Sequence, residues 1–110
     1  MRLEGLPAGV TDWSQVPASA HPGASGAATV RTRQLGEIQL RRVDYSPGYL
    51  ADHWCNQGHI AFVVEGELDM ELQDGRTSRL RAGMSFHVSD FGDAAHRASS
   101  RIGAKVMVVD

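Results

Sequence analysis

Residues 48–66 read GYLADHWCNQGHIAFVVEG and contain two of the five histidines and the only cysteine of the chain. His53 and Cys55 are two positions apart, so on an extended strand their side chains point to the same side. Asn56-Gln57-Gly58 is typical of a turn, which would bring His59 back to face the same space. Imidazole and thiolate groups are ligands of zinc and of other borderline transition metals. The spacing therefore predicts a metal site on a β-hairpin.

A fourth candidate ligand, His96, follows after a further strand pattern and a glycine-containing loop. Taken alone, a cysteine in such a chain is most often a small buried hydrophobe, and a strand histidine is most often a satisfied polar group. Metal binding is favoured here because the parity and the turn bring several such residues together. His21 and His87 lie outside this pattern, the first in an Ala/Pro/Gly/Ser stretch and the second out of phase with its apolar neighbours.

Length and composition indicate one globular domain. The chain has 110 residues, of which 42% are hydrophobic and 22% charged. The net charge is −2 and no basic block is present, so no nucleic-acid partner is expected. No apolar run reaches transmembrane length, and no membrane association is expected. A single cysteine cannot form an intrachain disulfide, which favours a reducing compartment and predicts a cytoplasmic protein.

The pattern along the chain predicts an all-β protein. Residues 1–28 are rich in Ala, Gly, Pro and Ser and are interpreted as an irregular N-terminal arm, with at most one short strand, packed on the domain at 29–110. No amphipathic helix is evident, and short strands recur with glycine-bearing turns between them, as in an antiparallel sandwich or barrel. The predicted strands are 29–33, 37–45, 50–55, 59–64, 67–72, 77–80, 84–88 and 104–109.

The region from Gly48 to His96 resembles the cupin superfamily. More closely, residues 45–55, which read YSPGYLADHWC, together with Gly58-His59-Ile60, resemble the small single-domain cupins named for a DHCW motif. His96-Arg97 and the closing residues 103–110 fit the same group. The resemblance implies a single-domain jelly-roll β-barrel with a metal in its mouth.

The resemblance also identifies departures from the usual ligand set. His53 and His96 stand where the superfamily motifs have histidines, whereas Cys55 replaces a second histidine and His59 replaces a glutamate. A set of three imidazoles and a thiolate favours zinc, leaves iron, nickel and copper possible, and disfavours manganese. It also argues against a simple transfer of the oxygenase chemistry of many iron cupins.

Two further residues are candidates for binding a small-molecule ligand. If Ile38 and Leu40 face inward, alternation carries Arg42 inward too, where an arginine suits the capture of a carboxylate. The alternative, which the sequence favours, is that Arg42 points to solvent. Tyr49 lies beside the Pro47-Gly48 turn and could line the mouth.

Three functions are compatible with the sequence: a metal-dependent enzyme acting on a small organic molecule, a binding or sensing module, and a closed structural metal site. No catalytic residue or reaction follows from the pattern. Phe62 and Val64 would lie on the outer face of a central strand, and with Trp13 they predict a covered face and a homodimer.

Overall fold

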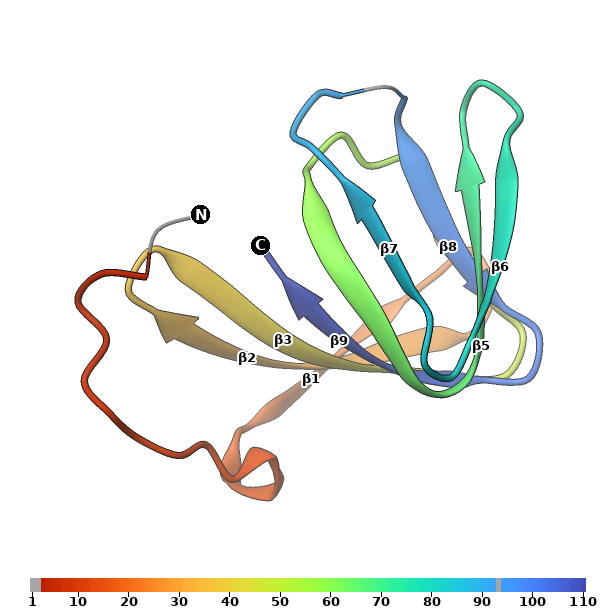
Figure 1. The fold of residues 1–110 in the computed structure, drawn as a ribbon. Coiled ribbons are helices and arrows are strands. Elements are labelled where there is room, and N and C mark those ends of the chain that lie inside the picture. Colours follow the sequence, from red (N-terminus) through yellow and green to blue (C-terminus); the bar gives the residue numbers. More distant parts are fainter. Residues whose placement is uncertain (1–2, 93) are drawn as a thin grey trace.

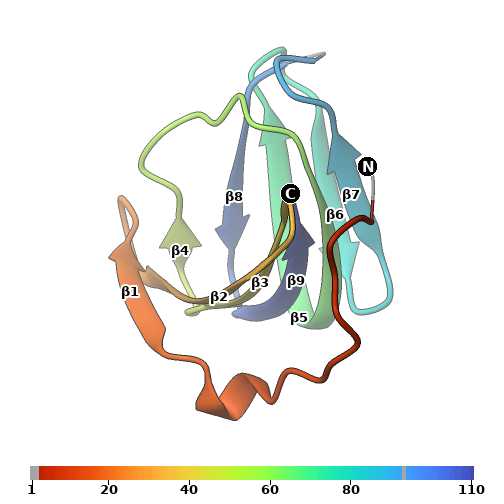
Figure 2. The same cartoon turned by 90° about the vertical axis from the view of Figure 1, so that its left-hand side faces the viewer.

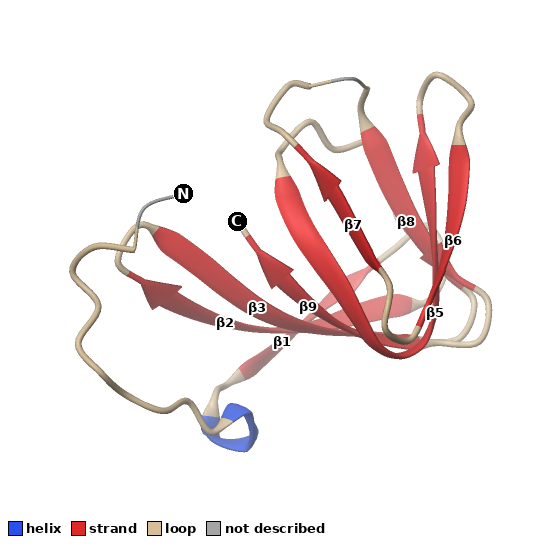
Figure 3. Cartoon of the chain, in the orientation of Figure 1, coloured by secondary structure: helices blue, strands red, loops and turns tan. Residues whose placement is uncertain are grey.

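The computed structural model describes residues 3–92 and 94–110, and it confirms the predicted all-β class (Figure 1; Figure 3). Within this range one short 3-10 helix precedes nine strands. No helix in these two segments is long and apolar enough to cross a membrane. The elements are η1 (Trp13–Gln15), β1 (Ala18–Pro22), β2 (Ala27–Leu35), β3 (Ile38–Tyr45), β4 (Tyr49–Leu50), β5 (His59–Leu72), β6 (Thr77–Arg81), β7 (Ser85–Val88), β8 (His96–Ser100) and β9 (Ala104–Val109).

The strands form one strongly curled antiparallel sheet. Its order is β1-β2-β3-β9-β5-β8-β4, and β6 and β7 each pair with β5 outside this path. The curl brings the β2-β3-β9 half opposite the half formed by β6, β8 and the end of β5, which gives the half-barrel of a jelly roll (Figure 1). The two halves leave a concave interior between them.

β5 belongs to both halves of the sheet. Its first residues pair with β7 and its later residues with β6, while β9 and β8 flank it in turn. The pairing with β9 is irregular between Val63 and Glu65, and Gly66 follows with a φ of +82°. A Cβ at position 66 would collide with the carbonyl oxygen of Gly103, so this bend requires glycine. The sequence predicts two strands, 59–64 and 67–72, and the structure corrects them to one continuous strand with a bulge.

The core lies on the concave face of the sheet. Along β5, Ala61 and Val63 are buried while Ile60, Phe62 and Val64 are each close to half exposed, which is the alternation of a strand with two different faces. The buried hydrophobic residues that pack together are Ala28, Val43, Ala61, Val63, Leu68, Met70, Leu80, Ala104, Val106 and Val108.

The N-terminal segment contributes an edge strand. β1 pairs with β2 through its whole length, and η1 lies at the bottom of the molecule, with the backbone N–H of Ser14 donating to Asp12 (Figure 2). Further upstream, Glu4 and Leu6 lie against Gly36 in the β2–β3 turn. Of the predicted arm at 1–28, residues 1 and 2 lie outside the described part of the chain, and the division at residue 28 stays a prediction.

Candidate metal and ligand site

A cavity of about 260 Å³ lies between the two halves of the curled sheet. All four candidate metal ligands and Tyr49 line it. Its wall is apolar on the core side and polar where the histidines lie. The lining residues are Arg41, Val43, Tyr45, Tyr49, Ala51, His53, Cys55, Gln57, His59, Ala61, Leu68, Met70, His96, Arg97, Ala98 and Val108.

Cys55 reaches the cavity from the loop that joins β4 to β5. The sequence predicts a strand at 50–55, whereas β4 ends at Leu50 and Cys55 forms only an isolated bridge with His96. The two residues exchange backbone hydrogen bonds, with N–O distances of 2.8 and 2.9 Å. Further along the same loop, the backbone N–H of Gly58 donates to Asp90 at 2.6 Å. These bonds hold the thiol-bearing loop against the start of β8.

His59 and His96 meet inside the cavity. Their ring centroids are 4.7 Å apart and the rings are nearly perpendicular. The side chain of His96 is buried, and neither of its ring nitrogens has a hydrogen-bond partner among the described residues. Buried polar atoms without partners are rare in folded proteins, and a neutral imidazole has both a donor and an acceptor to satisfy. The two ring nitrogens of His96 therefore indicate a ligand-binding site.

Burial keeps both of these imidazoles neutral. Desolvation, followed by the nearby His96 and Arg41, lowers the pKa of His59 to about 4. Burial also lowers the pKa of His96 from its ordinary value. A neutral imidazole is the form that can donate a lone pair to a metal. At neutral pH both rings are thus in the form that metal binding needs.

His53 lies at the rim of the same cavity. Its side chain is 75% exposed, and its Nδ1 is 2.6 Å from a carboxylate oxygen of Asp52. Metal-binding histidines commonly use one ring nitrogen to hydrogen-bond a carboxylate, which orients the other nitrogen toward the metal. The Asp52–His53 pair has this chemistry and leaves Nε2 available.

The four candidate metal ligands line one cavity, but their side chains do not form one cluster. Within residues 3–92 and 94–110, no three His, Cys, Asp or Glu side chains are close enough to hold one metal ion. The predicted convergence of all four ligand atoms on one point is therefore not met by these positions. His53 accounts for part of the spread because it is on an exposed bend and bonded to Asp52. The donor types and the unpartnered His96 nitrogens fit a metal.

Comparisons with known proteins bear on the fold of this site. No protein-family model matches the sequence, and no curated protein matches it either. Solved structures do match: an RmlC-like cupin from Shewanella frigidimarina is 22% identical, with a TM-score of 0.66 over 96% of this chain and 88% of that one. A sugar phosphate isomerase of the cupin superfamily from Silicibacter pomeroyi is 19% identical, with a TM-score of 0.71 over 92% of this chain and 74% of that one.

The chain has the cupin fold. A third similar structure is the Fe(II) form of HppE, which is 16% identical with a TM-score of 0.75 over 96% of this chain. This chain spans 60% of that protein. The predicted resemblance to cupins and the predicted jelly roll are thereby confirmed at the level of the fold.

The arginine that lines the cavity is Arg41, whereas Arg42 does not line it. Strand alternation in β3 places Arg41, Val43 and Tyr45 on the inner side, with Val43 in the core. Arg42 therefore lies on the outer side, with its Nε 4.0 Å from Asp44. The inward placement of Arg42 depended on Ile38 and Leu40 facing inward, and it is wrong because the outer face of this sheet is apolar as well. Arg41 is the residue that the sequence analysis missed.

Two tyrosines line the inner wall of the cupin barrel. The rings of Tyr45 and Tyr49 are 4.8 Å apart. Burial raises the pKa of Tyr45 to about 12, and burial also raises the pKa of Tyr49. Both phenols therefore stay protonated at neutral pH and can donate a hydrogen bond to a ligand.

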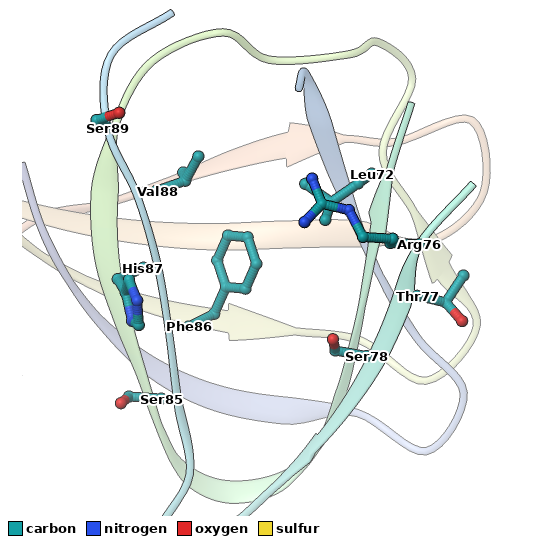
Figure 4. A pocket seen from close by; sticks show the side chains of 9 residues that line it. All are labelled: Leu72, Arg76, Thr77, Ser78, Ser85, Phe86, His87, Val88 and Ser89. Carbon is teal, nitrogen blue, oxygen red and sulfur yellow. The ribbon is translucent and has the colours of Figure 1, made fainter. Parts of the chain in front are cut away.

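A larger hollow of about 620 Å³ lies between β6 and β7 (Figure 4). None of the four candidate ligands lines it. Its polar side chains include the exposed Ser78, Ser85 and His87, which water can satisfy. Arg76 on its rim is bonded to Asp74 at 2.7 Å. The candidate functional site is therefore the smaller cavity, which is lined by His96 with its two unpartnered ring nitrogens and by the other candidate ligands.

Proposed function

We propose that this cupin holds a divalent transition metal in the mouth of its barrel, with zinc preferred, and binds a small organic molecule in the adjoining cavity. The observation that carries the proposal is His96, a buried histidine with both ring nitrogens unpartnered beside His59. A metal would take one of these nitrogens as a ligand, which removes the cost of leaving it unsatisfied.

His53, Cys55, His59 and His96 are the residues that would hold the metal. Three imidazoles and a thiolate suit zinc, and iron, nickel and copper are the alternatives. Iron has a precedent in the Fe(II) form of HppE, which shares the fold. When bound, such a metal supplies a Lewis acid for an oxygen atom of the ligand.

The chain's own residues would bind and shield the organic molecule. The inner wall formed by Val43, Leu68 and Met70 excludes water from the apolar part of a ligand. Tyr45 and Tyr49 remain protonated and serve as hydrogen-bond donors. None of the described lining residues is an Asp or Glu that could serve as a general base. The wall supplies an apolar surface and hydrogen-bond donors, and no reaction is assigned.

The same proposal includes a homodimer and a cytoplasmic location. Ile60, Phe62 and Val64 are all more than 40% exposed on the outer side of the barrel, and a second copy would cover them. The one cysteine, which has no disulfide partner, favours a reducing compartment.

Metal analysis of protein purified without an affinity tag tests the proposal. We expect about one zinc per chain by mass spectrometry after dialysis against a zinc buffer, and loss of most of it in His59→Ala. His87→Ala is the matched control, because His87 is an exposed histidine on the neighbouring strand β7, outside the cavity. Equal metal content in the two variants, or none in the native protein, would reject the metal site.

A further inference from the structure

The charge of the cavity wall indicates what kind of molecule it takes. Among the described residues that line it, Arg41 and Arg97 are cationic and none is acidic. These two guanidinium groups make the lining itself cationic, and each is paired with a carboxylate outside the lining, Arg41 with Asp110 and Arg97 with Glu71. Such a wall favours an anionic group over a cationic one.

Arg41 has hydrogen-bonding capacity left over. Its Nη2 donates to Asp110 at 2.7 Å, and Asp110 itself does not line the cavity. Its Nε is buried and has no hydrogen-bond partner among the described residues. Asp110, whose other carboxylate oxygen is also buried without a partner among the described residues, thus orients the guanidinium, and the N–H at Nε remains for another acceptor. A carboxylate is the acceptor that matches the planar fork of an arginine.

Arg97 is already occupied by its neighbours. Its Nε and Nη2 lie 3.1 and 3.5 Å from the carboxylate oxygens of Glu71. Its guanidinium also stacks over the ring of Trp54, 4.5 Å from the centroid. These contacts use the Nε of Arg97, the donor that Arg41 leaves without a partner. Arg41 is therefore the better candidate for contacting a ligand.

The size and floor of the cavity restrict the rest of the ligand. Because a water molecule occupies about 30 Å³ of liquid, the cavity holds a molecule of roughly nine non-hydrogen atoms. Its floor is formed by the apolar side chains of Val43, Leu68 and Met70. A phosphate dianion fits this setting less well, because it would bury two charges beside an arginine that Asp110 already half neutralises.

We propose that the cavity binds a small monocarboxylate with a short apolar chain, and that Arg41 is the residue that binds its carboxylate. The inference rests on the proposed function, since both place the organic molecule in the same cavity. It adds a specificity-determining residue and a ligand class. It does not require the metal, because Arg41 acts through its own hydrogen bonds.

Backbone amide NMR titrations test this directly. The probes are butanoate, its neutral analogue butanamide and inorganic phosphate, each added to zinc-loaded protein and to protein kept in a chelator. We expect butanoate to shift the amides of Ala61 and Val108, which line the cavity next to Arg41, in both preparations. Butanamide and phosphate should bind at least tenfold more weakly.

Substitutions then distinguish the role of Arg41 from that of the adjacent Arg42. Arg41→Gln should weaken butanoate binding at least tenfold, and Arg41→Lys should give an intermediate loss. Arg42→Gln is the matched control, since it removes the same charge from the outer side of β3 and should change the affinity less than twofold. The amide spectrum of each variant reports whether it is folded. The probe comparison on native protein does not depend on the variants.

The outcomes distinguish this inference from the proposed function. Zinc binding with equal affinities for butanoate and butanamide would overturn the carboxylate proposal and leave the metal site standing. Butanoate binding that needs Arg41 in protein that takes up no zinc would support the carboxylate proposal and overturn the metal. Tighter binding of phosphate, or an Arg41→Gln variant that binds butanoate like the native protein, would also overturn the assignment to Arg41.

Discussion

The imidazole of His96 lies edge to face against that of His59, 4.7 Å between centroids, at the point where β8 and the start of β5 meet the cavity. The sequence separates these residues by more than thirty positions. The fold brings them together because the start of β8 is bridged to Cys55, four residues before His59. Both rings are neutral, and neither ring nitrogen of His96 has a hydrogen-bond partner among the described residues. These nitrogens are therefore available to a ligand.

His96→Leu should separate the structural and the metal-binding roles of this residue. In a chelator we expect a change in unfolding free energy within about 1 kcal/mol, because the variant replaces unpartnered polar atoms by apolar ones of similar volume. With zinc at 100 times its Kd, the native protein should gain about 2.7 kcal/mol and the variant almost nothing. Urea unfolding with and without zinc measures both. His87→Leu should keep the full zinc effect, and an equal gain in the His96 variant would contradict a role in metal binding.

Cys55 should be protected from alkylation by metal. A thiolate bound to a cation is less available to iodoacetamide, so chelation should accelerate its modification several-fold. Cys55→His should retain metal with less preference for zinc, and Cys55→Ser should bind more weakly. Equal alkylation rates in zinc and in chelator, with unchanged metal content in the serine variant, would make Cys55 a buried thiol beside a histidine site.

Tyr45 predicts a loss of stability at alkaline pH. Its pKa is about 12 in the folded protein, against about 10 in an unfolded chain. Between these values only the unfolded chain loses the proton, so rising pH favours unfolding by up to about 1.4 kcal/mol per pH unit. The stabilising contribution is complete below pH 10 and disappears as the pH passes through 12.

Denaturation from pH 8 to pH 11.5 checks this, with Tyr45→Phe as the test variant. The phenylalanine variant should lose less stability than the native protein over the upper part of this range. Parallel curves for the two proteins would mean that Tyr45 ionises as freely in the folded state as in the unfolded chain.

Phe62→Glu should disrupt the proposed homodimer. Phe62 is 45% exposed on the outer side of β5, between Ile60 and Val64. A charge there cannot be buried against a second copy, so light scattering at micromolar concentration should give a dimer mass for the native protein and a monomer mass for the variant. Phe91→Glu, at an 81% exposed loop position, is the control and should leave the dimer intact. A native protein of monomer mass would end this proposal.

Much of the fold could be predicted from local patterns. The alternation of acidic and apolar residues at 67–72 and the Asp74-Gly75 turn predict a hairpin, and the structure has it between β5 and β6. β8 could not be predicted in this way. Its inward positions are His96, Ala98 and Ser100, which carry polar or small side chains, so no apolar alternation marks the strand. Ser100 is buried, and its hydroxyl donates a hydrogen bond to the backbone carbonyl of Glu67. This is a long-range contact that local sequence patterns do not contain.

The site itself was only partly accessible to sequence reasoning. The turn at 56–58 and the spacing of His53 and Cys55 do bring these residues to the same cavity as His59, although through an irregular loop. The alternation on β3 points to Arg42, one position after the arginine that lines the cavity. On β3 the apolar Leu40 faces the outer side, so apolar residues did not reveal which side was inside. Only Val43, packed in the core, fixes that choice.

The bend at Gly66 has a consequence for how the molecule opens. Since one strand supplies residues to both halves of the sheet, neither half can separate without breaking the pairing of β5. The barrel should therefore open as a single cooperative unit, and amides of Val63 and Met70 should exchange with solvent at the rate of global unfolding. A ligand bound at the mouth would then also slow the exchange of the amide of Val63, because that amide exchanges only when the whole barrel unfolds.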